Sequence, residues 1–388
     1  MDAVTNQTAG QFDLNEDQRA IQDMANAFAA DRVAPKALEW DKDRHFPADV
    51  IREVGPLGLG GIYVSEDVGG SGLGRLDAVL VFEALSRACP GFSSFISIHN
   101  MCAWMIDRFG NEEQRQLFVP KLTSMEWLAS YCLTEPGSGS DAAALKTRAV
   151  RDGDHYVLNG AKQFISGAGD SDVYVTMVRT GDEGPKGIST IVVPKDAPGL
   201  SFGALEHKMG WHMQSTRQVN FTDCRVPAEN LLSTEGAGFS IAMAGLDGGR
   251  LNIAACSLGG AQSALDKALS YAGERKAFGQ TIDRFQSLQF KLADMETELQ
   301  AARIFLYTAA SKLDAKAPDA SKWSAMAKRF VTDTGFDIAN NALQIHGGYG
   351  YLHDYGIEKL VRDLRVHQIL EGTNEIMRVI IARHLIGR

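Results

Sequence analysis

Residues 344–384 read QIHGGYGYLHDYGIEKLVRDLRVHQILEGTNEIMRVIIARH and guide the interpretation of the whole chain. Within this stretch Glu371 precedes an apolar series, Ile376, Val379 and Ile380, whose spacing is that of one helix face. This spacing predicts that Glu371 lies just before the N-terminus of a helix. A helix N-terminus favours an anion by about 0.3–1 kcal/mol, whereas burial raises a carboxyl pKa by up to ~3–5 units.

We expect burial to dominate in a dry site and to bring the pKa of Glu371 toward neutrality. A carboxylate with such a pKa is suited to take a proton from carbon. The alternative is a solvated glutamate that caps the helix, and on spacing alone this is the commoner case.

Length and charge limit the possible classes of protein. With 388 residues the chain is longer than a usual single core, so two or three domains are expected. The formal net charge is -9, and no stripe of basic residues is present to neutralise phosphates. We therefore expect no nucleic-acid partner, and an anionic ligand must be held by a few local groups.

The cysteines and histidines predict neither disulfides nor a metal site. Five cysteines form no CxxC pair, which indicates a reduced intracellular protein. Nine dispersed histidines show no metal-ligand spacing, so no metal is expected. Residues 1–18 lack the features of a presequence, which predicts a cytoplasmic location, or a mature mitochondrial matrix form. The uncharged run 90–106 carries serines, a histidine and an asparagine, so we expect a buried helix and no integral membrane segment.

The periodicity of apolar residues changes twice along the chain. Helical spacing and capping signals predict helices from Asn15 to Pro35, at 47–55, 75–88 and 91–109, and from 111 onward. Short β-branched runs separated by turn residues then predict strands at 156–158, 173–178, 188–193 and 219–221. After Gly238 long helical stripes return, for example from Leu288 to Leu313. The predicted fold is α+β, with an N-terminal helical domain at 1–127, a central antiparallel β-domain at 128–238 and a C-terminal four-helix bundle at 239–388.

Two glycine-rich segments are candidate ligand sites. In YCLTEPGSGSD, residues 131–141, the glycines allow backbone N–H groups to converge on an anion, although a tight turn between domains also explains them. In DGGR, residues 247–250, two glycines expose backbone at what we predict to be the start of a helix. Arg275, read alone, is a solvated charge after a helix.

Several motifs together resemble the acyl-CoA dehydrogenase family over essentially the whole chain. They are HGGYG at 346–350, Arg362-Asp363, Glu371-Gly372-Thr373 and the segment 131–141. The wording ILEGTNEIM, with Leu370 where many members have Tyr, most resembles the isobutyryl-CoA branch of that family. The resemblance implies the three-domain fold above, with FAD as cofactor and Glu371 as the catalytic base.

The resemblance also implies roles for individual residues. FAD contacts are expected from one subunit at Tyr131, Leu133, Thr134, Gly139, Ser140, Phe164, Ile165, Ser166, Thr373 and Glu375. From across a dimer they are expected at Arg275, Phe278, Phe285, Gln286, Gln344, Gly347 and Gly348. Contacts to acyl-CoA are expected at Ser140, Asp247, Gly248, Gly249, Arg250 and Arg383. Many members have Trp-Ile-Thr at positions 164–166, so the stacking surface here is smaller.

The implied reaction is α,β-desaturation of a short branched acyl-CoA, isobutyryl-CoA to methacrylyl-CoA in valine catabolism, by a homotetramer that passes electrons to an electron-transfer flavoprotein. Alternatives within the fold are a 2-methylbutyryl-CoA or straight short-chain acyl-CoA dehydrogenase, and a flavin oxidase or monooxygenase. An inactive helical scaffold is the alternative from another class. One methyl group in an apolar pocket is worth only ~1–3 kcal/mol, which leaves the acyl chain open.

Overall fold

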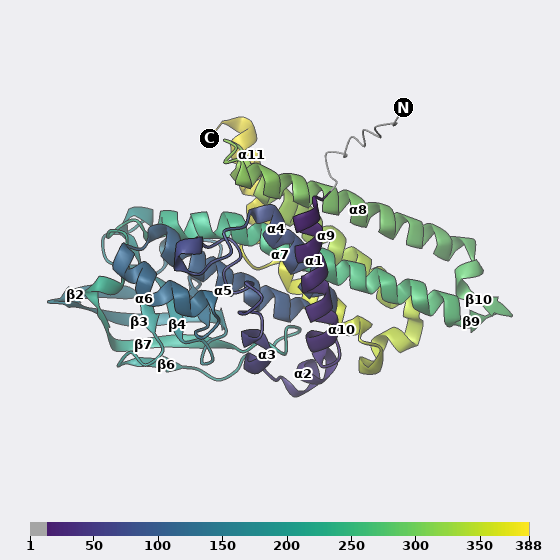
Figure 1. The fold of residues 1–388 in the computed structure, drawn as a ribbon, viewed down its shortest axis with the longest axis horizontal. Helices are drawn as coiled ribbons and strands as arrows, with labels where there is room; N and C mark the ends of the chain where they lie inside the picture. The colour runs from purple at the N-terminus through teal and green to yellow at the C-terminus, as the bar shows by residue number, and fades with distance from the viewer. Residues whose placement is uncertain (1–13, 388) are drawn as a thin grey trace, which may run out of the picture.

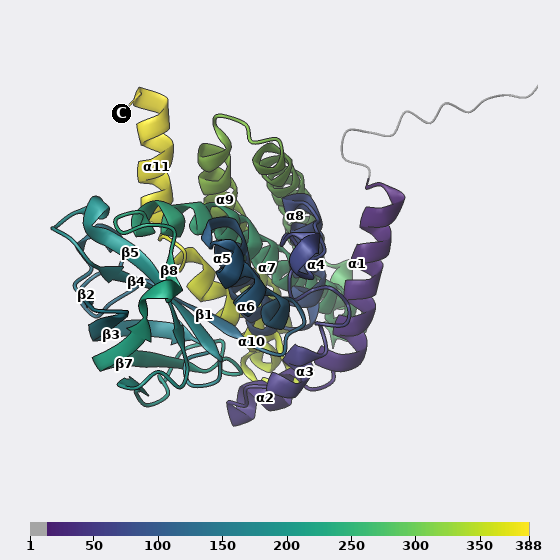
Figure 2. The same ribbon diagram turned by 60° about the vertical axis from the view of Figure 1, so that its left-hand side comes forward.

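The computed structural model describes residues 14–387. The prediction that residues 1–18 contain no presequence falls mostly on residues 1–13, which lie outside the described part. A β-sheet with short connecting segments occupies one end of the molecule, and helices from both ends of the chain form the rest (Figure 1). Figure 2 shows the sheet beside the helices, with α11 projecting from the body near the C-terminus. The predicted α+β fold is confirmed, while the domain boundaries stay predictions.

The N-terminal helices begin and end close to the predicted positions. Asn15 and Gln18 form a reciprocal capping box at the start of the first helix, and Asn111 and Gln114 form another. Each capping side chain satisfies an N–H group that has no partner within the helix. The helices are α1 (Glu16–Phe28), α2 (Ala37–Asp43), α3 (Ala48–Arg52), α4 (Arg75–Ala88), α5 (Pro90–Phe109) and α6 (Glu112–Thr123).

The central sheet has the strand order β6-β7-β3-β2-β4-β5-β8, and β1 pairs with β4. Most neighbours are antiparallel, as predicted, but β1 runs parallel to β4, and β2 makes a short parallel pairing with β4. Parallel pairing joins strands that are distant in sequence, so local runs did not reveal it. The strands are β1 (Ala129–Cys132), β2 (Arg148–Asp152), β3 (His155–Ser166), β4 (Val173–Arg179), β5 (Ile188–Pro194), β6 (Leu200–Phe202), β7 (Thr216–Pro227) and β8 (Leu231–Leu232).

Long helices form the C-terminal part. They are α7 (Gly238–Glu274), α8 (Gln286–Asp314), α9 (Ala320–His346), α10 (Ile357–Arg365) and α11 (Asn374–Ile386). The short hairpin β9 (Lys276–Ala277) and β10 (Gln280–Thr281) joins α7 to α8 at the end far from the sheet (Figure 1). The prediction that residues 247–250 open a helix is wrong, because they lie inside α7. The structure gives these glycines a packing role within the helix.

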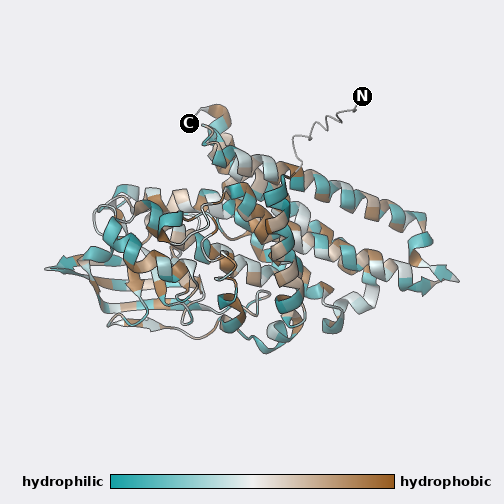
Figure 3. Ribbon diagram, in the orientation of Figure 1, coloured by the Kyte–Doolittle hydropathy of each residue, from teal (hydrophilic) through white to brown (hydrophobic). Residues whose placement is uncertain are grey.

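The core lies where the helices meet one another and the sheet. The stripe from Leu251 to Ala272 on α7 is buried, as its small and apolar residues predict. In Figure 3 hydrophobic and hydrophilic residues alternate along most of the helices. No helix in the described part of the chain is long and apolar enough to cross a membrane.

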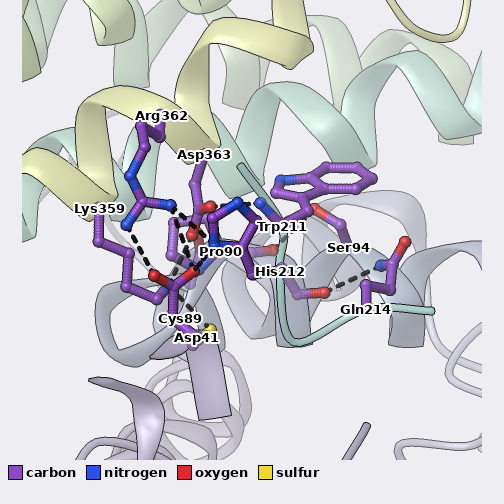
Figure 4. Close-up of polar contacts among 12 residues, drawn as sticks. Asp41, Cys89, Pro90, Ser94, Trp211, His212, Gln214, Lys359, Arg362 and Asp363 are labelled. Atoms are coloured by element: carbon purple, nitrogen blue, oxygen red, sulfur yellow. Dashed lines mark hydrogen bonds and ion pairs between the residues drawn. The ribbon is translucent and has the colours of Figure 1, made fainter. Parts of the chain in front are cut away.

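A buried polar network joins three parts of the chain (Figure 4). On α10, Lys359 and Asp363 form an ion pair, and Asp363 also accepts the Trp211 backbone N–H at 2.6 Å. The neighbouring Arg362 binds Asp41 of α2 at 2.6 Å. The Arg362-Asp363 motif therefore ties α10 to the N-terminal helices and to the loop that precedes β7.

Candidate active site

Glu371 lies in a strained turn directly before α11. Its φ is +54° and that of Gly372 is +91°, so two consecutive residues are left-handed. Thr373 then caps α11, its hydroxyl accepting the Ile376 N–H at 3.3 Å. A left-handed conformation at a residue other than glycine costs on the order of 1–3 kcal/mol and persists only where its surroundings hold it.

Helix α7 approaches the Glu371 carboxylate through a glycine. A Cβ added at Gly249 would lie 2.5 Å from Glu371 Oε2, and 3.2 Å from Met101 Sδ on α5. At Gly248 a Cβ would lie 2.3 Å from Arg75 Nη1. The two glycines predicted to expose backbone therefore make room for side chains, and Gly249 allows the carboxylate to contact the helix.

One oxygen of the Glu371 carboxylate is shielded from solvent. Its Oε2 atom is buried and has no hydrogen-bond partner, although the residue as a whole is partly exposed. Burial raises the pKa of Glu371 to about 7, while Lys328 and Arg250 act in the opposite direction. The sequence predicted the effect of burial on this pKa. It gave no signal for Lys328, which lies within the helical stretch now seen as α9.

Arg250 is held beside this site by Asp247. Its Nη1 lies 2.6 Å from Asp247 Oδ1, and Ser321 of α9 donates to the same oxygen at 3.0 Å. Arg250 is 5% exposed and its Nε atom is buried without a partner. The arginine is therefore fixed in place, and its buried Nε–H donor is available.

The glycine-rich turn 131–141 is anchored to β3. Gln163 donates its backbone N–H to the Thr134 carbonyl at 2.8 Å. Buried Lys162 donates to the Leu133 carbonyl at 3.1 Å and to Glu135 at 2.8 Å. These bonds bring the predicted segments 131–140 and 164–166 side by side. Nothing lies within 4 Å of a Cβ added at Gly139, so space is open beside the turn.

Phe164 is turned out of the sheet by an irregularity in β3. The register with β7 shifts between Lys162 and Ile165, and Phe164 has φ +59° and is 64% exposed. Ile165 is only 3% exposed and packs in the core. Tyr131 of β1 adds a buried hydroxyl without a hydrogen-bond partner. Burial is the largest cause of the raised pKa of Tyr131, and electrostatic repulsion from Cys102 and then from Glu371 raises it further. Ser140 is exposed on the turn.

The remaining predicted residues lie elsewhere. Arg275, Gly347 and Gly348 line a cavity of about 360 Å³ at the far end of α7, with Arg275 5.3 Å from the Tyr349 ring centre. Arg250 and Arg275 are roughly 38 Å apart along α7, at ~1.5 Å per residue. The structure therefore gathers the predicted residues into two separate groups in one chain.

This second group is largely exposed. Phe278, in the hairpin, is 95% exposed and contacts the Phe285 ring edge-on. Gln286 at the start of α8 and Gln344 near the end of α9 are exposed too. On α11 Thr373 and Glu375 follow Glu371 closely, whereas Arg383 lies on the exposed outer half of the helix.

A cavity of about 620 Å³ is lined by residues of α2 and the β-domain, including Arg44 and Ser215. It contains none of the predicted residues. The buried, unpartnered carboxylate of Glu371 therefore identifies the candidate site better than cavity size does.

Known families and structures resemble this chain along nearly its full length. The acyl-CoA dehydrogenase N-terminal, middle and C-terminal domains match residues 15–126, 130–224 and 236–386. The mitochondrial isobutyryl-CoA dehydrogenase of Dictyostelium discoideum is 59% identical, over 96% of this chain and 90% of that protein.

Two solved structures share the whole fold. Butyryl-CoA dehydrogenase from Megasphaera elsdenii has a TM-score of 0.94 at 37% identity, over 97% of this chain and 99% of that one. A chain from work on the electron transferring flavoprotein of Acidaminococcus fermentans has a TM-score of 0.95 at 42% identity, over 97% and 100%.

Proposed function

The chain belongs to the acyl-CoA dehydrogenase family, and from this we propose that it desaturates isobutyryl-CoA between Cα and Cβ to methacrylyl-CoA. The family is flavin-dependent, and we propose FAD as the cofactor. The observation that carries the proposal is the Glu371 carboxylate, whose buried Oε2 has no protein partner.

We propose Glu371 as the base that takes the α proton. A pKa of about 7 leaves a substantial fraction of the group ionised at neutral pH and able to accept a proton. As the proton leaves, charge develops on the thioester oxygen, and preorganised donors there are worth several kcal/mol. In the described residues the Glu371 backbone N–H makes no hydrogen bond, which supports it as one such donor.

The residues fit a bound flavin. Exposed Phe164, the open space beside Gly139 and the unpartnered Tyr131 hydroxyl support a site for the ring system next to Glu371. Arg275 is suited to bidentate binding of the pyrophosphate. When bound, the flavin supplies the acceptor for the hydrogen and electron pair that leave the β carbon.

The two groups of predicted cofactor residues support an assembly of at least two chains. One group surrounds Glu371 and the other lies near Arg275, roughly 38 Å away along α7. A complete site then needs Arg275, Gly347 and Gly348 from a second subunit. We propose a homotetramer built as a dimer of dimers.

The substrate and partner proposals rest on the relatives. An isobutyryl-CoA dehydrogenase at 59% identity supports a short branched acyl chain. The shared fold with a chain from work on an electron transferring flavoprotein supports such a protein as electron acceptor. Five free, buried cysteines support a reducing compartment, the cytosol or the mitochondrial matrix.

Glu371→Gln tests the proposed base. The variant should purify yellow but fail to bleach when isobutyryl-CoA is added without oxygen, whereas the wild type bleaches. Bleaching of the variant at the wild-type rate would remove Glu371 from the reaction. A panel of short straight and branched acyl-CoAs, compared by kcat/KM, tests the substrate, and rapid peroxide production would indicate an oxidase instead.

A further inference from the structure

Lys328 of α9 is a fully buried lysine next to the candidate base. It is 0% exposed, and its Nζ donates to the Gly372 carbonyl at 2.8 Å and to Asn374 Oδ1 at 2.9 Å. These acceptors lie one and three residues after Glu371. The ammonium group thus contacts the turn that carries the carboxylate.

The contacts of Lys328 are part of a larger set of hydrogen bonds between α9 and this turn. Asn374 Nδ2 donates to Thr332 Oγ1 at 3.0 Å and to Asp333 Oδ1 at 2.7 Å, both on α9. Glu371 and Gly372 are both left-handed, so the turn needs external support to persist. Helix α9 supplies that support through three side chains, Lys328, Thr332 and Asp333.

The charge of Lys328 has no close counter-ion. In residues 14–387 it forms no ion pair within 4.0 Å, whereas Arg250, the other cation near Glu371, is paired with Asp247 at 2.6 Å. A buried ammonium without a paired anion is costly. The Glu371 carboxylate is the leading source of compensation, ahead of Asp333 and Glu375.

We propose that Lys328 is a positioning residue for Glu371, whose ammonium holds the strained turn against α9 and keeps the carboxyl group ionised before the substrate binds. This inference rests on the proposed function, because it assumes that Glu371 is the base. The Lys328 ammonium then has two roles, since it fixes both the geometry of the turn and the protonation state of Glu371.

The pKa values agree with this geometry. Burial lowers the pKa of Lys328 to about 8, Glu371 opposes that shift, and Lys328 in turn lowers the pKa of Glu371. Between pH 7 and 8 the two groups titrate as a coupled pair. The ammonium form is still the majority at pH 7.

The histidine, cysteine and tyrosine side chains around the pair stay neutral in this range. Burial lowers the pKa of His367 to about 3 and raises the pKa of Cys256 to about 12. It raises the pKa values of Tyr63 and Tyr131 as well. A change in the titration of Glu371 on removing Lys328 is therefore assigned to the lysine.

The experiment compares Lys328→Met, Lys328→Gln and Lys328→Arg as FAD-loaded enzymes. The rate of anaerobic bleaching by isobutyryl-CoA is measured from pH 6 to 9.5, together with the infrared carbonyl band of the protonated Glu371 carboxyl without substrate. Glu371→Gln assigns that band. For Met and Gln the Glu371 titration should move up by about 1–3 pH units, because an adjacent opposite charge has been removed.

At pH 7 the Met and Gln variants should consequently bleach roughly 5- to 500-fold more slowly, and should recover as the pH rises. Lys328→Arg should keep the wild-type titration. Lys291→Met is the matched control, since Lys291 also bonds an α9 side chain, Asn341 at 3.0 Å, and it should change neither readout.

An equal loss of rate at every pH, with an unmoved infrared titration, would reduce Lys328 to a structural residue and overturn the proposal. If Met and Gln fail to fold, Lys328→Arg decides alone: a titration displaced by more than one unit contradicts the proposal. The infrared readout needs no turnover, so it stays valid even if Glu371→Gln shows that another group is the base.

Discussion

Replacing Gly249 by alanine should separate stability from catalysis. The new Cβ would lie 2.5 Å from Glu371 Oε2 and 3.1 Å from its Cδ, where ordinary contact begins at 3.4 Å. The oxygen must therefore move by about 0.9 Å. Because it is the end of a flexible side chain, this movement costs little folding energy. The expected loss of rate is ~100-fold, the usual effect of misplacing a reacting group by about 1 Å.

The assay is the rate of anaerobic bleaching, measured beside thermal unfolding. Alanine is favoured over glycine within a helix by about 1 kcal/mol, so the melting temperature of Gly249→Ala should hold or rise while the rate falls. Gly273→Ala is the control, because it lies in the same helix and its Cβ meets nothing within 4 Å. It should be stabilised without a change in rate. Wild-type bleaching by Gly249→Ala would refute the close approach of the carboxylate to α7.

Three further predictions follow from the charges. The pKa of Glu371 is raised from 4.5 to about 7. The free energy of unfolding of the wild type, relative to that of Glu371→Gln, should therefore fall by on the order of 3 kcal/mol as the pH rises from 4.5 to 7. If chemical denaturation gives both proteins the same dependence of unfolding free energy on pH, this prediction is contradicted. Arg275→Ala should weaken FAD binding about 10- to 100-fold by equilibrium titration, since a charged hydrogen bond is lost; unchanged affinity would exclude Arg275 from the cofactor site. Asp363→Ala should cost about 3–5 kcal/mol in chemical denaturation, because it leaves Lys359 buried without its partner; a loss below 1 kcal/mol would count against the pair.

Local signals predicted most of the fold. Asn15 with Gln18 marks the start of α1, and Arg75–Ala88 was predicted with the limits that the structure has. Such signals act over a few residues and survive in a single sequence. The parallel pairing of β1 with β4 depends on a distant partner, and it was not foreseen.

The sequence predicted only those site residues that belong to a recognisable motif. Glu371 and Arg250 stand in recognisable segments, but Lys328 lies in a helical stretch where nothing distinguishes it from a solvated lysine. The glycines at 248–249 predict exposed backbone at a helix start, whereas the structure places them inside α7. Glycine is needed at these two positions because of tertiary packing, since Arg75 and the Glu371 carboxylate occupy the space of the missing side chains.

The left-handed backbone at Glu371 has a consequence for sequence variation. Glycine tolerates this conformation without strain, and asparagine and aspartate tolerate it better than most residues, whereas β-branched residues do so poorly. In a saturation library scored for cellular abundance, Gly, Asn and Asp should outrank Val, Ile and Thr at position 371. Scored for turnover, the same library should favour glutamate. The reaction therefore requires at position 371 a residue type that the left-handed backbone disfavours.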